Sequence, residues 1–379
     1  MSHPPTVEQV TEALATVQDP EIHKPITELD MVDAVDVAPD GAVRVSVLLT
    51  IQGCPLHDTI KRDVTGAVAR LSGVSGVEVV FGVMSDEQRQ TLQRRLMGDQ
   101  GAREIPFAAS DSLTKIYAVA SGKGGVGKSS VTVNLAAATA DRGLKVGILD
   151  ADIYGHSVPR MLGVTGKPTQ VEQMIMPPES LGMKVISIGM FTAGNTPVVW
   201  RGPMLHRALQ QFLADVYWGD LDVLFMDLPP GTGDIALSVA QLLPNAEILV
   251  VTTPQQASAE VAERAGAIAL QTHQRIAGVI ENMVWLPCPH CGQKVDVFGS
   301  GGGQMVAEAL TRALGAHVPV LGQVPLDIRL REQSDLGDPL VLAEPDTPAA
   351  KELLAIADKL SARGRGLAGR RLGLSPIST

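Results

Sequence analysis

The residues between Gly122 and Ser129 have the types and the spacing needed to bind the phosphate groups of a nucleotide. The segment reads G-K-G-G-V-G-K-S and fits the pattern G-x-x-x-x-G-K-[ST]. In this pattern glycines let backbone N–H groups wrap closely around an anion. We expect Lys128 to reach the β- and γ-phosphates and the Ser129 hydroxyl to bind Mg²⁺.

A second lysine, Lys123, lies inside the same loop. The phosphate cradle does not require it, so it is either a solvated surface lysine or a residue that reaches a phosphate across a dimer interface. The residues expected to contact the nucleotide in this segment are Gly122, Lys123, Gly124, Gly125, Val126, Gly127, Lys128, Ser129 and Ser130.

Carboxylates follow two other apolar segments. Asp227 ends the run V-L-F-M-D, where it is expected to face Mg²⁺, and Gly231 and Gly233 after it allow the next loop to respond to the γ-phosphate. Asp150 and Asp152 end another run, at the strand edge where open α/β sheets bind ligands. We expect Asp152 to orient or deprotonate the attacking water, whereas Asp150 fits a structural turn equally well.

The chain has three cysteines, and two of them, Cys288 and Cys291, form a C-x-x-C pair. Thiolates at this spacing suit one metal ion or one edge of an iron–sulfur cluster, but such sites usually need four ligands. His290 lies between the cysteines and is expected to point away. A symmetric dimer that supplies two cysteines per subunit would complete the site. A redox dithiol and an inert pair are the alternatives.

The third cysteine, Cys54, lies at an expected strand-to-helix junction. Its thiol either has a lowered pKa near a helix N-terminus or is a small buried filler, and the sequence favours neither.

Apolar strands alternate with helices from residue 113 onward, which predicts a doubly wound, mostly parallel α/β sheet in residues 113–360. The phosphate loop falls between a strand and the helix Val131–Ala140, as such a loop requires. The expected strands are Ile116–Ala120, Val146–Leu149, Val185–Ile188, Val223–Met226, Ile248–Thr252 and Ile276–Ile280.

Residues 1–97 have the pattern of a small α+β domain. A loose segment at 98–112 is expected to be a linker, and the basic, Gly-rich residues 361–379 a disordered tail. The elements expected in the first domain are helices Val7–Val17, His57–Leu71 and Asp86–Met97 and strands Val32–Val37, Val43–Thr50 and Val77–Val83.

The composition limits the class of protein. The formal net charge of −10 disfavours nucleic acid as a partner, because non-specific binding to phosphates needs clustered Lys and Arg. No apolar run approaches the roughly 20 residues that span a bilayer, and the N-terminus has no apolar signal region. We therefore expect a cytoplasmic protein without a membrane partner.

Taken together, these motifs resemble a known family. The segment Lys123–Ser129 is similar to the deviant Walker A motif of the MinD/ParA-like ATPases. The segments DADIYG, WRGPM (Trp200–Met204), MDLPPGTGD, ENM (Glu281–Met283) and CPHC resemble its Mrp/ApbC branch, the iron–sulfur cluster carrier ATPases. Residues 1–97 resemble the MIP18-like domain that often precedes this ATPase. The resemblance covers nearly the whole chain, and it is specific because MinD- and ParA-like relatives lack the C-x-x-C.

The resemblance implies a slow ATP hydrolase that acts as a homodimer. Lys123 would contact the nucleotide across the dimer, Asp152 would serve hydrolysis, and Asn282 would contact adenine. Cys288 and Cys291 of both subunits would hold one [4Fe-4S] cluster, received from a scaffold protein and passed to apo-proteins. His156 stands where the family often has Pro, and we expect it to change the stiffness of its loop.

Two other functions remain open from the sequence. A ParA/MinD-like positioning ATPase would need an amphipathic membrane helix or a basic DNA-binding face, and neither the Gly-rich tail nor the acidic net charge supplies one. An ATP-driven electron-transfer reductase would use the same cysteines without releasing the cluster. A structural zinc site shared by two chains is a further possibility for the cysteine pair.

Overall fold

The structure is a computed structural model of the 379-residue chain. It describes residues 3–20, 22, 24–50, 57–97, 105–109, 112–152, 155–191, 202–231, 234–255, 269–272, 274–288 and 290–362. Several residues singled out in the sequence lie outside this part: Cys54, Trp200, Gly233 and the tail from 363 to 379.

The chain divides into two compact units. The first comprises Met1–Arg103 together with Thr169–Met176, and the second comprises Glu104–Pro168 and Pro177–Thr379. The segment 169–176 is a short hairpin that interrupts the second unit in sequence and groups with the first in space. Its Glu172 carboxylate pairs with the Arg89 guanidinium at 2.7 Å, so a contact within the first unit holds the hairpin.

The first unit is a three-stranded sheet in the order β1-β2-β3, and the first two helices of the chain pack against it. Alternate residues of the central strand point to these helices and are buried: Val43, Val45, Val47 and Leu49. Its elements are α1 (Val7–Leu14), β1 (Val32–Val37), β2 (Ala42–Leu49), α2 (His57–Val68), β3 (Gly76–Val83) and α3 (Asp86–Met97), with β6 (Thr169–Val171) and β7 (Met174–Met176) in the hairpin.

The second unit is built on an eight-stranded sheet in the order β15-β12-β11-β4-β10-β5-β9-β8. All neighbouring strands are parallel except β8 and β9. The strands are β4 (Lys115–Ala120), β5 (Val146–Asp150), β8 (Glu179–Ser180), β9 (Met183–Ser187), β10 (Val223–Asp227), β11 (Glu247–Thr252), β12 (Ile276–Asn282) and β15 (Val320–Val324).

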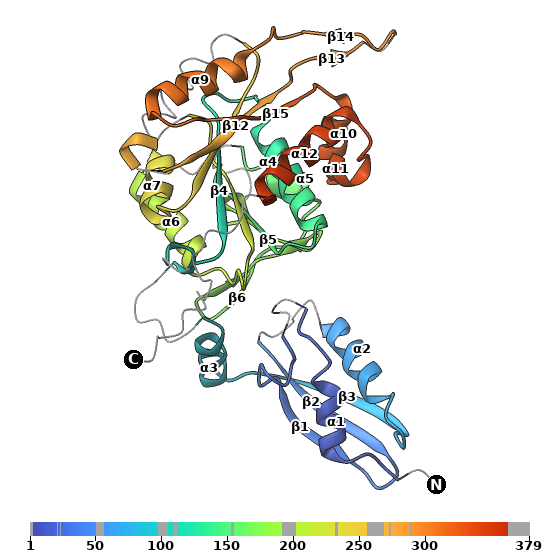
Figure 1. Cartoon of the computed structure of the whole chain (residues 1–379). Helices are drawn as coiled ribbons and strands as arrows, with labels where there is room; N and C mark the ends of the chain where they lie inside the picture. The colour runs from blue at the N-terminus through green and yellow to red at the C-terminus, as the bar shows by residue number, and fades with distance from the viewer. Residues whose placement is uncertain are drawn as a thin grey trace, which may run out of the picture. The chain divides into compact units, whose positions relative to one another are not determined.

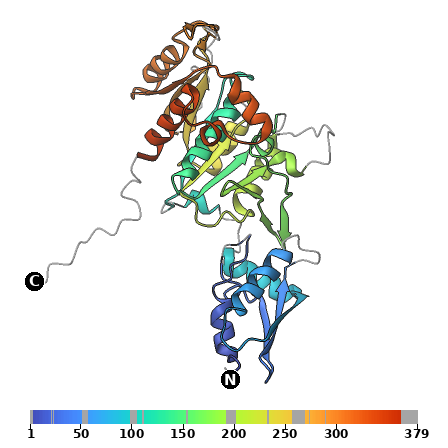
Figure 2. The ribbon, with the colours of Figure 1, turned by 90° about the vertical axis from the view of Figure 1, so that its right-hand side faces the viewer.

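Helices cover both faces of this sheet (Figure 1). On one face lie α4 (Lys128–Asp141), α5 (Val158–Met161), α10 (Ile328–Leu336), α11 (Leu340–Ala343) and α12 (Pro348–Ala362). On the other lie α6 (Gly202–Ala214), α7 (Asp234–Leu242) and α9 (Gly302–Leu314). Helices α4 and α12 pack side by side (Figure 2), and the aliphatic core, with Leu135 and Leu353, fills the space between them and the sheet.

This architecture confirms the predicted doubly wound α/β fold with a small N-terminal α+β domain. The six strands expected in the second unit are present, and each differs from the prediction by one or two residues at one or both ends. The strand β15 was not predicted. Its centre is Gly322, where a Cβ would lie 2.6 Å from atoms of Glu352 and Ile356 on α12, so close packing by that helix replaces the strand-forming side chain.

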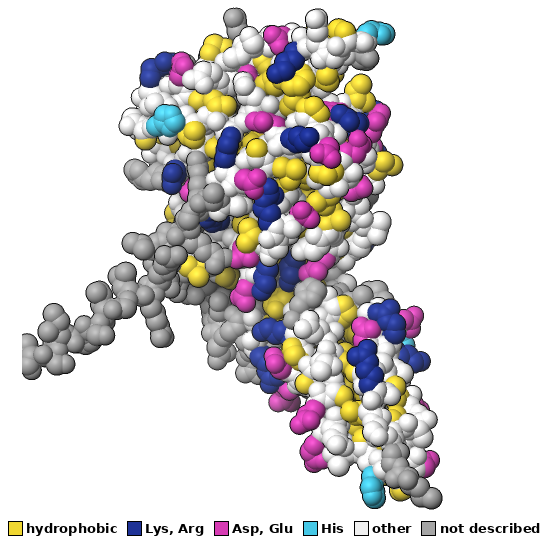
Figure 3. Space-filling view, turned by 45° about the vertical axis from the view of Figure 1, so that its right-hand side comes forward, with side chains coloured by type: hydrophobic (Ala, Val, Ile, Leu, Met, Phe, Trp, Pro, Cys, Tyr) yellow, Lys and Arg dark blue, Asp and Glu magenta, His cyan; other side chains and the backbone are white. Residues whose placement is uncertain are grey.

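None of the helices in the described part of the chain is long and apolar enough to cross a membrane. On the face of the molecule drawn in Figure 3, side chains of Lys and Arg are interspersed with those of Asp and Glu. Charges of one sign do not gather into a large basic surface on that face.

Candidate functional site

The phosphate loop connects β4 to α4, as the sequence predicted. The helix begins at Lys128, and the preceding Gly127 has a left-handed conformation with φ of 78°. A Cβ at Gly127 would also lie 2.3 Å from Nδ2 of Asn282, so both the backbone conformation and the available space require glycine. The first turn of α4 presents backbone N–H groups and the positive end of the helix dipole, which together form an anion site.

Asn282, at the end of β12, lies against this loop. Its side chain is 1% exposed, and its Nδ2 donates to the carbonyl of Val126 at 2.9 Å. Its Oδ1 is buried and accepts no hydrogen bond from any described residue. Because a buried acceptor without a donor is costly, this amide fits a ligand that donates an N–H group, as the amino group of adenine does.

The end of β10 brings Asp227 to the start of α4. The Asp227 carboxylate forms an ion pair with Lys128 at 2.7 Å and accepts hydrogen bonds from Ser129 Oγ at 2.6 Å and Thr132 Oγ1 at 2.8 Å. Lys128, Thr132 and Asp227 are all buried. A hydroxyl and a carboxylate side by side are hard oxygen donors, so Ser129 and Asp227 fit a Mg²⁺ ion.

Thr132 was not identified from the sequence. The motif ends at Ser129, and a threonine one turn into a helix gives no signal of its own. Only the fold, which places β10 beside β4, shows that Thr132 and Ser129 hold the two oxygens of one carboxylate.

The carboxylates at the end of β5 have different environments. Asp150 is fully buried, and its burial together with the nearby Asp227 carboxylate raises its pKa to about 8. Asp152 follows in the loop, and its Oδ1 accepts a hydrogen bond from the N–H of Gly155 at 3.0 Å. Residues Ile153 and Tyr154 between them lie outside the described part of the chain.

Lys123 lies at the partly exposed side of the phosphate loop. Its Nζ donates a hydrogen bond to the side-chain oxygen of Gln255, which follows β11. Within one chain the second lysine of the loop therefore has a neutral polar partner. Gln255 was not identified from the sequence, because it lies 132 residues from Lys123 along the chain.

The two cysteines lie on a hairpin formed by β13 (Leu286–Pro287) and β14 (Lys294–Val295). The backbone N–H of Cys288 donates to Gln293 at 2.9 Å, and that of Gly292 donates to Cys288 at 2.8 Å, which closes the turn. Cys288 is partly buried and Cys291 is exposed. Backbone N–H groups of His290 and Cys291, and then the Cys291 thiol, lower the pKa of Cys288.

The cysteine pair has no further ligands nearby among the residues that the structure describes. In that part of the chain no group of three or more His, Cys, Asp or Glu side chains could hold a metal ion. His290 is exposed. The hairpin thus offers two thiols at an accessible turn, which is half the donor set that a tetrahedral site or an iron–sulfur cluster requires.

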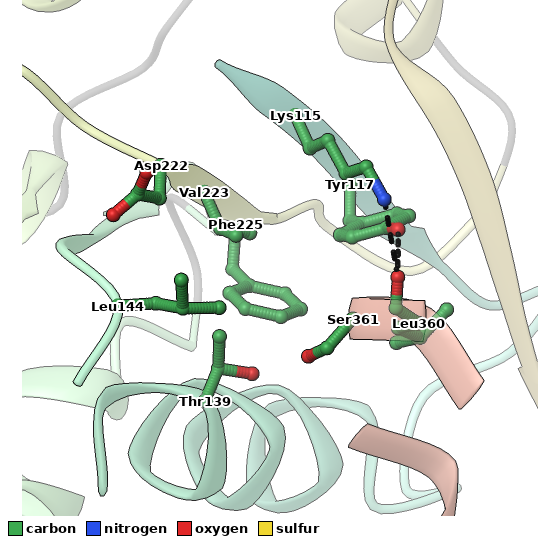
Figure 4. A pocket seen from close by; sticks show the side chains of 9 residues that line it. All are labelled: Lys115, Tyr117, Thr139, Leu144, Asp222, Val223, Phe225, Leu360 and Ser361. Carbon is green, nitrogen blue, oxygen red and sulfur yellow. Dashed lines mark hydrogen bonds between the residues drawn. The ribbon is translucent and has the colours of Figure 1, made fainter. Parts of the chain in front are cut away.

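A small cavity of about 80 Å³ lies away from this site, at the opposite end of the strands (Figure 4). It is bounded by the first residues of β4 and β10 and by the ends of α4 and α12. Lys115 Nζ and the Tyr117 hydroxyl both donate to the carbonyl of Leu360 at its edge, at 3.3 and 3.1 Å. We assign it no role in nucleotide binding.

Comparison with known families gives two matches along the chain. Residues 112–361 match the ParA model, described as NUBPL iron-transfer P-loop NTPase. Residues 7–79 match the model described as an iron-sulfur cluster assembly protein. The first match contains every residue of the nucleotide site and both cysteines of the hairpin.

Individual proteins are also similar over most of the chain. The iron-sulfur cluster carrier protein of Mycobacterium tuberculosis is 66% identical over 364 residues, which is 96% of this chain and 95% of the relative. That of Synechocystis is 40% identical and covers 94% of this chain and 98% of the relative. A solved nucleotide-binding protein from Archaeoglobus fulgidus in complex with ADP is 35% identical, with a TM-score of 0.54, over 66% of this chain and 96% of that one.

Proposed function

Because this chain belongs to the NUBPL iron-transfer P-loop NTPase family, we propose that it carries an iron–sulfur cluster and passes it to apo-proteins. In this proposal the protein acts as a homodimer and slowly hydrolyses ATP with Mg²⁺. Its partners are a scaffold that supplies the cluster and the apo-proteins that receive it. The printed names of its relatives, iron-sulfur cluster carrier proteins, support this assignment.

The observation that carries the proposal is the incomplete thiol site on the β13–β14 hairpin. Cys288 and Cys291 are accessible at a turn, and the lowered pKa of Cys288 favours the thiolate, the form that binds iron. Two thiols from a second chain would complete four ligands for one [4Fe-4S] cluster. A cluster held only by exposed turns of two chains is accessible to a recipient, as transfer requires.

The nucleotide site is proposed to work through residues that the fold brings together. The loop from Gly122 to Ser130 would hold the phosphates, with Lys128 leaving Asp227 for the β- and γ-phosphates. Asn282 Oδ1 would accept from the adenine amino group. Mg²⁺, held by Ser129 and Asp227, would neutralise phosphate charge.

Two further residues would serve hydrolysis. Asp152 is proposed to orient the attacking water, and Lys123 to exchange Gln255 for a phosphate bound to the other chain. Both roles place charge where it develops in the reaction, which is the main way in which proteins catalyse phosphoryl transfer.

The short distance in sequence between the two sites supports coupling between nucleotide and cluster. Asn282 ends β12, and the cysteine hairpin begins at Leu286, after three intervening residues. The N–H of Val284 in this segment donates to Val324 of β15, which ties it to the sheet. We propose that a change at Asn282 on nucleotide binding moves the hairpin and thereby alters cluster release.

The proposed roles of the parts of the chain follow the domain boundaries predicted from the sequence. We propose that residues 1–97 form the MIP18-like domain, 98–112 a linker, 113–360 the ATPase domain and 361–379 a basic tail. The match of residues 7–79 to an iron-sulfur cluster assembly family supports a part for the first domain in receiving or delivering the cluster.

The test is anaerobic reconstitution with iron and sulfide, followed by transfer to an apo-ferredoxin. We expect the wild type to hold a cluster and transfer it, and Cys288→Ala and Cys291→Ala to do neither while still binding ATP. Gln293→Ala is the matched control, since it changes an exposed side chain of the same hairpin and keeps both thiols. Equal transfer by the cysteine variants and the wild type would rule out the carrier function. Redox cycling without loss of the cluster would point to a reductase instead.

A further inference from the structure

A buried carboxylate that the proposed function does not use joins both ends of the loop that carries Asp152. Asp150 is 0% exposed, so no ligand reaches it. Its Oδ1 accepts from the N–H of Asp152 at 3.1 Å, and its Oδ2 accepts from the N–H of Val158 at 3.3 Å. Asp152 is near the beginning of the loop, and Val158 is the first residue of α5 after it. A single side chain thus closes the loop.

The neighbouring strand holds this carboxylate in place. Ser187, the last residue of β9, lies beside Asp150 in the strand register and is fully buried. Its hydroxyl donates to Asp150 Oδ2 at 3.1 Å and accepts from the N–H of Gly189 at 3.2 Å. Since Ser187 has no contact of its own with the nucleotide loop among these bonds, any effect it has on catalysis passes through Asp150 or through Gly189.

A second contact fixes the far part of the same loop. The ring of His156 lies directly on Gly189, where a Cβ would be 2.2 Å from its Cδ2. Only glycine therefore allows this approach. We call Asp150, Ser187, Gly189 and His156 the Asp150 cluster. His156, which was expected from the sequence to change the stiffness of its loop, thus contacts the residues that follow β9.

We propose that Asp150 and Ser187 are positioning residues for ATP hydrolysis, which hold the backbone on which Asp152 is oriented. The proposal deepens the proposed function and rests on it. Asp152 Oδ1 accepts from the N–H of Gly155, so the direction of its carboxylate depends on the loop backbone that Asp150 holds. A displacement of a catalytic group by about 1 Å can cost about 100-fold in rate.

Binding of the nucleotide should be largely separate from this cluster. The phosphates are held by the loop before α4 and by Lys128, whereas the Asp150 cluster joins the ends of β5 and β9 to α5. A loss confined to the rate of hydrolysis would therefore distinguish positioning of Asp152 from general damage to the fold, which would weaken binding as well.

The experiment measures ATP affinity with a fluorescent analogue and kcat in the full-length protein. For Ser187→Ala we expect kcat to fall by about 10- to 100-fold while the Kd for ATP stays within about twofold. Thr139→Ala is the matched control. It also removes a buried hydroxyl, one that donates within α4 to Leu135, and it should leave both quantities near wild type.

A double-mutant cycle keeps the test decisive if Asp150→Asn, whose amide NH₂ group cannot accept a hydrogen bond, disturbs the loop by itself. If both residues act through one hydrogen bond, adding Ser187→Ala to Asp150→Asn should lower kcat little further. Unchanged kcat in Ser187→Ala, equal losses in Thr139→Ala, a matching loss of affinity, or fully additive effects would each overturn the proposal. A wild type that binds no ATP would instead overturn the proposed function, and this inference with it.

Discussion

At the residue scale, the buried charged groups of the candidate nucleotide site contact one another. Asp227 forms an ion pair with Lys128 and accepts hydrogen bonds from the hydroxyls of Ser129 and Thr132. Asp150 lies close by, and its raised pKa favours the neutral acid. Burial is the larger cause of this raised pKa, and the nearby Asp227 carboxylate is the smaller one.

The raised pKa of Asp150 predicts how stability depends on pH. In the unfolded chain this carboxyl has its ordinary pKa of 3.8, and in the folded protein a pKa of about 8. The folded state therefore binds the proton more tightly, and this stabilisation is lost as the pH rises from about 4 through about 8. Asp150→Asn has no titrating carboxyl at this position, so its free energy of unfolding should not show this decrease. Between pH 5 and pH 8 the free energy of unfolding of the wild type should therefore fall relative to that of the variant.

Urea unfolding at several pH values measures this difference. All three tryptophans lie between residues 200 and 285, so tryptophan fluorescence follows the second unit. Thr139→Ala serves as the control, because it changes stability without removing a titrating group. Parallel curves of unfolding free energy against pH for the wild type and Asp150→Asn would contradict the assignment.

The sequence predicted some residues of the candidate site and missed others, and this difference has a physical reason. Lys128, Ser129 and Asp227 were identified because each belongs to a local sequence motif. In such a motif the neighbouring residues indicate the role of each residue. Thr132 and Ser187 were missed because their roles depend on which strands become neighbours in the sheet. For Asp150 the sequence left a structural turn open, and the structure shows a carboxylate that binds the backbone of a turn.

At the element scale, the β13–β14 hairpin concentrates the chemistry of the cysteines. Its tight turn directs backbone N–H groups at Cys288, as a helix N-terminus would, and so favours the thiolate. The C-x-x-C pair was identified from the sequence, but the strands that flank it have two residues each, too few for a pattern of alternation to be read.

The hairpin predicts a measurable difference in thiol reactivity. In the reduced, cluster-free protein, the pH–rate profile for alkylation of Cys288 should have its midpoint below the ordinary thiol value of 9.0. Unfolding in urea should move this midpoint upward, because the N–H groups of the turn are then lost. Peptide mass spectrometry after timed iodoacetamide treatment assigns the modification to each cysteine. A midpoint that is the same in the folded and unfolded protein would contradict the structure of the turn.

Elements with continuous apolar runs were predicted well, because strands covered on both faces need such runs. The segment β15 was missed because Gly322 interrupts its run where α12 packs closely. The hairpin β6–β7 was missed for a different reason. All three residues of β7 are buried, so this short strand shows no alternation of apolar and polar residues that the sequence could reveal.

At the whole-molecule scale, the sheet of the second unit brings the proposed nucleotide residues together, whereas the cysteine hairpin supplies two thiols. The nucleotide site is assembled from β4, β5, β10 and β12 of one sheet. The thiol site has two ligands on an exposed turn, and under the proposed function a second copy of the same surface completes it. A symmetric pair of chains provides this directly, because the same two cysteines then come from each side.

The most direct test of this account is native mass spectrometry of the protein reconstituted anaerobically with iron and sulfide. We expect a dimer that holds one [4Fe-4S] cluster, with Gln293→Ala behaving like the wild type and Cys288→Ala losing the cluster. A cluster bound to each monomer, or a dimer that holds zinc and no iron under these conditions, would contradict the proposal that two chains share one transferable iron–sulfur cluster.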